Sequence, residues 1–151
     1  MNRFGISTHL FHEQRLSREH LVHIAAYGFE TIELFATKTH FNYHDAQAAA
    51  ELAEWLSDTR LQLHSVHAPI VESLQDGKWV GSFSNASGDE SRRRAALAET
   101  EATLGIARQT PFQYLVLHLG MPTVERVPPG DNQPAASRRS LEEIAEMASR
   151  V

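Results

Sequence analysis

The pattern of apolar and polar residues alternates along the chain between short strands and longer helices. Apolar runs rich in branched and aromatic side chains predict four strands, at residues 3–7, 31–35, 61–68 and 114–119. Apolar residues at helical spacing predict helices after Ser17, over residues 44–57, over residues 90–109 and after Ser140. Strands that alternate with helices are typical of a parallel sheet, because each helix returns the chain to the edge where the next strand begins. The pattern therefore predicts an α/β fold.

Capping residues predict where two of these helices begin. Ser17 has the side chain of an N-cap, and Gly28 is placed to end the helix that follows it. In the sequence SLEE, Ser140 is a second predicted N-cap, and Glu143 three residues later completes a capping box.

Two long segments follow the third and fourth predicted strands. Residues 70–91 are polar and rich in Gly and Ser, and residues 121–137 contain four of the six prolines. We predict both as loops at the carboxyl ends of strands, where α/β proteins bind their ligands.

Side chains alternate between the two faces of a strand, so the pattern also predicts which residues share a face. Ile32 and Leu34 form the apolar, helix-covered face of the second strand. The opposite face, near the carboxyl ends, holds polar side chains from all four strands: Ser7, Glu33, Ser65, His67 and His118. This convergence predicts a binding site at one rim of the sheet. The same alternation predicts that His64 faces the helices as a structural histidine.

Composition narrows the chemistry of this site. The chain has no cysteine, which excludes disulfides and thiolate metal ligands and suits the cytoplasm. The net charge of -5 argues against nucleic acid as a partner, and Arg92–Arg94 are predicted as a solvated helix face. No apolar run approaches the roughly 20 residues that span a membrane. Nine histidines remain, and imidazole is the commonest metal ligand.

Three motifs at the predicted strands resemble one known family. GFETIEL leads into the second strand, SVHAP ends the third, and VLHLG ends the fourth. Together they resemble the xylose-isomerase-like barrel superfamily, which includes sugar isomerases and epimerases and the abasic-site endonucleases of the endonuclease-IV type. The resemblance covers essentially residues 1–151 as a single domain. It implies the parallel (βα)4 N-terminal half of a TIM (βα)8 barrel that is truncated before strand five.

The resemblance also implies a divalent metal (Mn, Mg, Co or Zn) at the mouth of the barrel. By motif match, His67 and His118 are the implied metal ligands. The main acid–base and metal-binding carboxylates of the sugar enzymes are expected beyond Val151, so two imidazoles alone leave metal binding by this chain doubtful. Glu33 is either a third ligand or a partner for a substrate hydroxyl.

A sugar or sugar phosphate is the implied substrate, with Ser7, His9, Glu33 and Trp79 as candidate contacts. Trp79, in the segment 70–91, either stacks on a sugar ring or anchors its own loop. The histidines on or beside the loops after the first two strands are individually expected to be solvated: His9, His12, His40 and His44.

Three functions stay open from the sequence. The first is the N-terminal part of a metal-dependent sugar isomerase or epimerase, inactive by itself. The second is an abasic-site phosphodiesterase, which the two histidine motifs match well. The third is a non-catalytic half-barrel that forms a homodimer, because a half-barrel exposes its first and last strands as unpaired edges.

Overall fold

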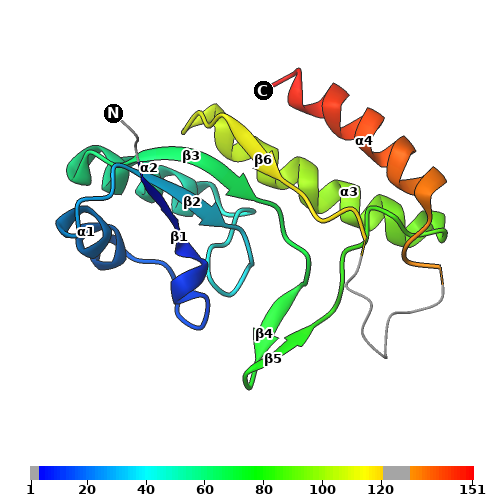
Figure 1. The fold of residues 1–151 in the computed structure, drawn as a ribbon, viewed down its shortest axis with the longest axis horizontal. Helices are drawn as coiled ribbons and strands as arrows, with labels where there is room; N and C mark the ends of the chain where they lie inside the picture. The colour runs from blue at the N-terminus through cyan, green and yellow to red at the C-terminus, as the bar shows by residue number, and fades with distance from the viewer. Residues whose placement is uncertain (1–3, 121–129) are drawn as a thin grey trace.

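The four predicted strands form one parallel sheet. The structure is a computed structural model and describes residues 4–120 and 130–151. The strand order is β1-β2-β3-β6 (Figure 1), so the strands lie side by side in the order in which they occur along the chain. Their bounds are Gly5–Ser7 for β1, Thr31–Phe35 for β2, Gln62–His67 for β3 and Tyr114–Val116 for β6. Neighbouring strands run in the same direction, which confirms the predicted α/β fold.

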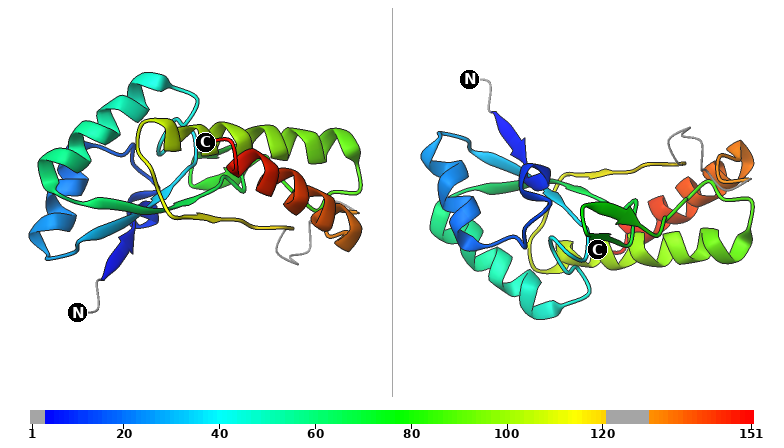
Figure 2. Two further views of the ribbon diagram at one scale, coloured as in Figure 1. Left: turned by 90° about the horizontal axis from the view of Figure 1, so that it is seen from above. Right: turned by 90° about the horizontal axis from the view of Figure 1, so that it is seen from below.

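The helices follow the strands as predicted; the first three lie on one side of the sheet, and the last one packs against the third (Figure 2). The α-helices are α1 Arg18–Ala26, α2 Ala46–Thr59, α3 Glu90–Leu104 and α4 Pro134–Ala148, with short 3-10 helices η1 Thr8–Phe11 and η2 Gly105–Arg108. Asp45 caps α2 by accepting a hydrogen bond from the Gln47 amide, and Asp89 caps α3 in the same way from the Arg92 amide. None of the helices in the described ranges is long and apolar enough to cross a membrane.

The apolar core lies between the helices and the face of the sheet predicted to be covered. Ile32 and Leu34 of β2 are both 0% exposed, and they pack with Leu21 of α1, Leu52 of α2 and Ile106 of η2. Burying side chains of this size stabilises the fold by about 1.5–3 kcal/mol each. The core therefore occupies one face only and leaves the other face of the sheet to the polar residues.

A bulge in β3 changes the predicted alternation of its side chains. Ile32 pairs with Leu63 but Glu33 pairs with Ser65, so His64 is an extra residue in the ladder. Leu63 therefore points into the core, where it is 6% exposed, and His64 is exposed with its ring 5.1 Å from that of Tyr114. The prediction that His64 faces the helices is wrong, because strict alternation does not account for an inserted residue.

The segment 70–91 is not the unstructured loop that we predicted. It contains an antiparallel hairpin, with β4 at Ser73–Gln75 and β5 at Lys78–Val80. Asp76 and Gly77 join the two strands with φ values of 50° and 70°. Two positive φ values in a two-residue turn suit the right-handed twist of a hairpin, and the Asp-Gly pair accepts them easily. Of the second predicted loop, residues 121–129 lie outside the described ranges.

Helix α4 begins at Pro134, six residues before the predicted N-cap. Proline suits the first turn of a helix because its missing N–H needs no partner there. Ser140 is instead buried in the second turn, where its Oγ donates to the Asn85 carbonyl at 2.7 Å and accepts from Arg93 at 3.2 Å. The predicted capping box is therefore wrong, since the Ser140 hydroxyl serves a tertiary contact.

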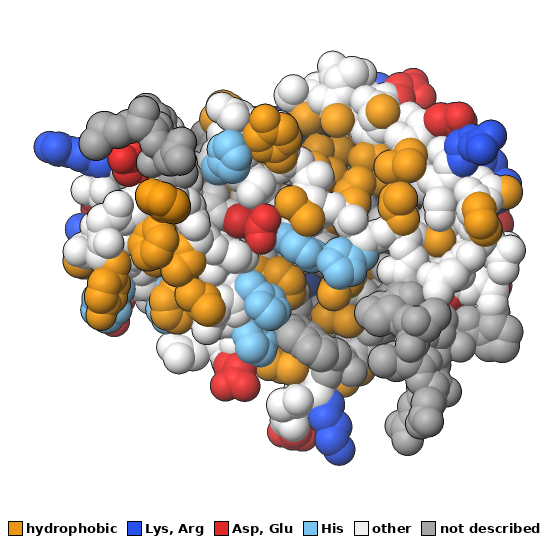
Figure 3. Space-filling model, viewed as in Figure 1, with side chains coloured by type: hydrophobic (Ala, Val, Ile, Leu, Met, Phe, Trp, Pro, Cys, Tyr) orange, Lys and Arg blue, Asp and Glu red, His pale blue; other side chains and the backbone are white. Residues whose placement is uncertain are grey.

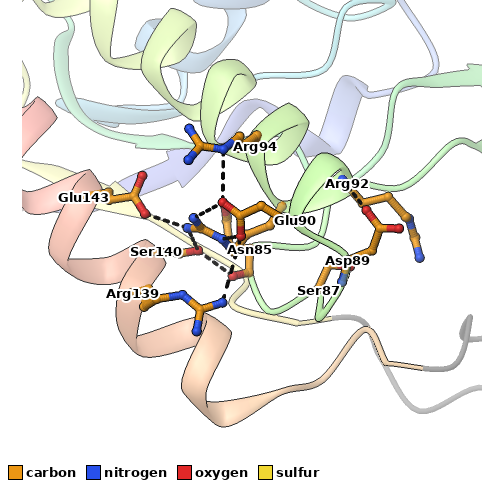
Figure 4. A network of polar contacts seen from close by, with 10 residues as sticks. Asn85, Ser87, Asp89, Glu90, Arg92, Arg94, Arg139, Ser140 and Glu143 are labelled. Atoms are coloured by element: carbon orange, nitrogen blue, oxygen red, sulfur yellow. Dashed lines mark hydrogen bonds and ion pairs between the residues drawn. The ribbon is translucent and has the colours of Figure 1, made fainter.

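Arg93 connects α3 to α4 through its side chain. The prediction that Arg92–Arg94 form a solvated helix face is wrong for this residue, because it is buried. Its side chain is 3% exposed and pairs with Glu90 of its own helix at 2.8 Å and with Glu143 of α4 at 2.7 Å. Figure 4 shows both carboxylates, with Ser140 beside them. These pairs raise the pKa of the guanidinium further above its ordinary value, even though burial opposes the charge. Arg94 does face solvent, with its side chain 70% exposed.

We expect Arg93→Met to lower the free energy of unfolding by about 1–3 kcal/mol, because it removes charge-assisted hydrogen bonds that join two helices. Arg94→Met is the matched control, and its exposed ion pair is worth under about 0.5 kcal/mol. Urea unfolding followed by circular dichroism measures both. Equal losses for the two variants would mean that the Arg93 contacts contribute nothing beyond surface charge.

Candidate functional site

The carboxyl ends of the parallel strands meet around an open hollow of about 370 Å³. Its lining includes five of the predicted site residues: Ser7, His9, Glu33, His67 and His118. Figure 3 shows histidine side chains gathered in the middle of this face. They meet because parallel strands all end at the same edge of the sheet, which also explains why two strands carry a histidine at this end.

His67 and His118 lie side by side, as the motifs predict. Their ring centroids are 5.0 Å apart. The His67 Nδ1 atom lies 2.9 Å from the Ala68 carbonyl oxygen, which only accepts hydrogen bonds, so Nδ1 carries the proton. In the neutral ring, Nε2 then has a free lone pair for a metal or a hydroxyl.

The pKa of His118 lies below its ordinary value. Burial is the main cause, and the neighbouring His67 ring adds to it because two cations this close would repel each other. His118 therefore favours the neutral imidazole, which is the form that binds metals.

Phe35 lines the hollow between two pairs of histidines, His67 with His118 and His9 with His12. Its ring is 5.4 Å from that of His67 and meets the His9 ring edge-on at 4.4 Å. His9 in turn stacks on His12 at 4.7 Å. Burial lowers the pKa of His9, and the nearby His12 and His67 lower it further against the opposing effect of Glu33. Phe35 was not predicted as a site residue, although its position two residues after Glu33 placed it on the same face.

Glu33 is the carboxylate of the hollow. Its Oε2 accepts a hydrogen bond from the Ser65 hydroxyl at 3.2 Å. Two predicted site residues on adjacent strands are therefore in direct contact. Ser7 is held nearby, with its hydroxyl accepting from the His9 amide at 3.3 Å. A carboxylate has several acceptor positions, so Glu33 retains capacity for a sugar hydroxyl or a cation.

The described residues form no group of three or more histidine and carboxylate side chains placed to hold a metal ion. His67 and His118 fit as part of a donor set, since imidazoles suit first-row divalent metals. A well-held ion needs at least three protein ligands. The described residues therefore do not make up a metal site by themselves, and the roles of His67 and His118 as metal ligands and of Glu33 as a substrate or metal contact stay predictions.

His40 is buried beneath the hollow and is not solvated as we expected. Its side chain is 0% exposed, and Nδ1 donates to the Gln14 carbonyl at 2.6 Å. The other nitrogen therefore accepts from the Thr8 hydroxyl at 3.2 Å, and this hydroxyl accepts from the Phe35 amide at 2.9 Å. Burial lowers the pKa of His40. The chain of hydrogen bonds fixes the backbone of Phe35 from below.

One other histidine and one tryptophan complete the predicted set. His44 is exposed but bonded, with Nε2 2.8 Å from Glu99 of α3, a carboxylate that also accepts from Tyr43 and pairs with Lys38. Trp79 lies on β5, but its side chain is outside the described part of the structure, so its sugar contact stays a prediction.

Four parallel strands with helices on one face and polar side chains at their carboxyl ends define half of a β/α-barrel with its ligand-binding rim. Residues 21–151 match the xylose isomerase-like TIM barrel family, and the chain belongs to this family. The resemblance found in the three histidine and glutamate motifs is thereby confirmed, and so is the half-barrel fold.

Solved structures with the same fold are about twice as long as this chain. A D-tagatose 3-epimerase-like protein superposes with a TM-score of 0.70 at 19% identity over 99% of this chain and 49% of its own. The 3-keto-D-glucoside 4-epimerase from E. coli gives 0.63 at 15% identity over 99% and 53%. An AP endonuclease of family 2 from Brucella melitensis gives 0.56 at 20% identity over 99% and 50%. No curated protein matches the sequence significantly. At these identities the likeness establishes the fold alone.

Proposed function

We propose that this chain forms the N-terminal half of the active site of a divalent-metal-dependent sugar isomerase or epimerase. The observation that carries the proposal is the hollow in which the paired imidazoles of His67 and His118 lie near the carboxylate of Glu33. Membership of the family supports it. Two of the similar solved structures are described as sugar epimerases or epimerase-like proteins.

Each group in the hollow has a chemical role in this proposal. His67 and His118 hold the metal through imidazole nitrogens, and the Ala68 carbonyl orients the first of these rings. A divalent ion, when bound, polarises the carbonyl and adjacent hydroxyl oxygens of a sugar. Glu33 accepts a hydrogen bond from a hydroxyl group of the sugar, and Phe35 contacts an apolar edge of the sugar.

The carboxylate that removes the proton from the carbon beside the carbonyl comes from outside these 151 residues, as does the rest of the metal ligand set. The incomplete ligand group among the described residues supports this part of the proposal. The chain alone therefore binds metal and sugar weakly and does not isomerise or epimerise the sugar. The predicted cytoplasmic location stays a prediction.

Titration of the chain with Co²⁺ and then with free and phosphorylated ketoses tests the proposal. We expect the NMR signals of the His67 and His118 rings to shift and broaden with Co²⁺, and the Phe35 ring signals to respond when a ketose follows. The His23 ring on the exposed surface of α1 serves as an internal control. If His23 responds as strongly as the other two rings, the metal binds histidines without selection and the proposal fails.

An abasic-site endonuclease is the second candidate, because the structural relatives include an AP endonuclease of family 2. The charges oppose it: the chain carries a net charge of -5, and neither lysine nor arginine lines the described hollow. A protein that follows the DNA backbone needs basic residues on its binding surface. Binding of an abasic duplex in preference to ketoses, measured by fluorescence anisotropy, would favour this candidate over the first.

A further inference from the structure

His118 lies beyond the end of its strand. Among the described residues, the pairing of β6 with β3 stops at Val116, whose carbonyl accepts from the Ala68 amide at 2.9 Å. His118 follows two residues later, yet its ring lies 5.0 Å from that of His67 on β3. The strand pairing alone does not fix the backbone at this point, so contacts outside the ladder contribute to the position of the ring.

The chain just after His118 packs against the segment that leads into α4. A Cβ atom at Gly120 would overlap the side-chain amide of Asn132 and would lie 3.5 Å from the Asp131 carbonyl oxygen. Asn132 therefore lies directly over the backbone of Gly120, in the space that a side chain would fill. Such a close approach requires glycine. The position of residues 130–133 thus limits where the end of β6 can lie.

Residues 130–133 are in turn held by the loop that leads into α3. Three hydrogen bonds of 2.7 to 2.8 Å connect the two segments, and they join Gly88 to Gly130, Gln133 to Ala86 and Ser84 to Asp131. The first two are formed by backbone groups, and in the third the serine hydroxyl donates to a backbone carbonyl. The loop after β3 and the segment before α4 therefore form one connected unit at the rim.

A buried ion pair fixes this unit to α3. The side chain of Asp131 is 0% exposed, and its two carboxylate oxygens accept from the two terminal nitrogens of Arg92 at 2.7 Å each. Arg92 lies in the first turn of α3 (Figure 4). A two-bond pair of this kind fixes the orientation of both groups as well as their distance. A carboxylate buried this deeply is costly without its partner, so the segment depends on the pair.

We propose that Arg92 and Asp131 are positioning residues for His118. Their ion pair holds Asn132 against Gly120, and this contact holds the end of β6 so that the His118 ring stays beside the His67 ring. The assignment rests on the proposed function, because it concerns the geometry of the two imidazoles that share the metal ion. Arg92 and Asp131 act through the backbone and contact neither metal nor sugar.

NMR of the metal-free chain tests this role. Rings with centroids 5.0 Å apart give a nuclear Overhauser effect between His67 and His118 in the wild type. We expect Arg92→Met to weaken this effect and to broaden the His118 ring signals. The His67 ring signals should keep their line width, because β3 is paired on both sides by β2 and β6.

Arg93→Met is the matched control. Arg93 is the next residue of the same helix and is also buried, but it pairs with Glu90 and with Glu143 of α4. Its replacement should lower the stability of the chain and leave the contact between the two rings unchanged. A general loss of stability is thereby separated from a change in the position of one ring.

Two milder variants identify the contact that carries the effect. Asn132→Ala keeps the ion pair and removes the side chain that lies over Gly120, so it should change the same ring as Arg92→Met. Arg92→Lys keeps the charge but loses the two-bond geometry, so it should give a smaller change in the same direction. Circular dichroism shows whether each variant is folded, and the two milder variants decide the question if Arg92→Met does not fold.

Calorimetry with Co²⁺ adds a measure of metal binding. Arg92→Met should weaken Co²⁺ binding about tenfold, as expected when the groups that orient a metal ligand are disturbed. In a chain that already carries His118→Gln it should cause little further loss, because both changes act through the same ligand. Arg93→Met should bind Co²⁺ as the wild type does.

The positioning role is overturned if Arg92→Met broadens the His67 and His118 rings equally, or if Arg92→Met and Arg93→Met change them equally. The ion pair would then only stabilise the fold. An unchanged His118 ring in Asn132→Ala also overturns it. A wild-type chain whose rings do not respond to Co²⁺ contradicts the proposed function instead, and the contact between the rings in the metal-free variants still decides the positioning role.

Discussion

Replacing His67 by glutamine is expected to weaken Co²⁺ binding about tenfold or more. The side chain is one of two adjacent imidazoles in the hollow, and its Nδ1–H is already used by the Ala68 carbonyl, so its Nε2 is directed to bind. Disturbing only the groups that orient a metal ligand already costs about 10- to 100-fold in affinity. Isothermal titration calorimetry with Co²⁺ alone measures the loss without requiring turnover.

His118→Gln should have a similar effect, and the double variant should lose little more than either single one. Two ligands of one ion act as a unit, so the second loss removes an interaction that is already broken. His23→Gln on the exposed surface of α1 is the control and should bind as the wild type does. If the losses in Co²⁺ binding free energy of the two single variants add up to the loss of the double variant, the two rings do not share a metal ion.

Replacing His40 by leucine should lower the free energy of unfolding by about 2–3 kcal/mol, because Thr8 and the Gln14 carbonyl lose their buried partner. The change lies beneath Phe35, whose amide donates to the same Thr8 hydroxyl. The ring of Phe35 should therefore become more mobile, and ketose binding should weaken together with stability. Urea unfolding and the NMR line width of the Phe35 ring measure the two effects.

The same variant should change how stability depends on pH. Burial lowers the pKa of His40 in the folded chain below its ordinary 6.5. The unfolded chain therefore takes up a proton first as the pH falls, so the wild type loses stability from about pH 7 downward until the folded pKa is reached. His40→Leu removes this contribution and makes the curve shallower, and His9 and His118, whose pKa values are also lowered, account for the slope that remains. A wild-type stability that stays constant between pH 7 and 5 would contradict this prediction.

The fold was predictable because local patterns agree with tertiary packing over most of the chain. Apolar residues at strand and helical spacing determine which segments form β1, β2, β3 and β6 and which face of β2 is buried. Parallel strands must then end at one rim, so the meeting of His67 and His118 followed from their positions at two strand ends. No knowledge of distances was needed for this step.

Other features depend on contacts between residues far apart in the sequence. The bulge that turns His64 to the inner face arises in the pairing of β3 with β2. Arg93 is buried only because Glu143 and Ser140 of α4 surround it, and His40 only because Gln14 and Thr8 accept and donate to its ring. A local pattern assigns polar residues to solvent by default. Only the folded chain provides the partners that make burying them favourable.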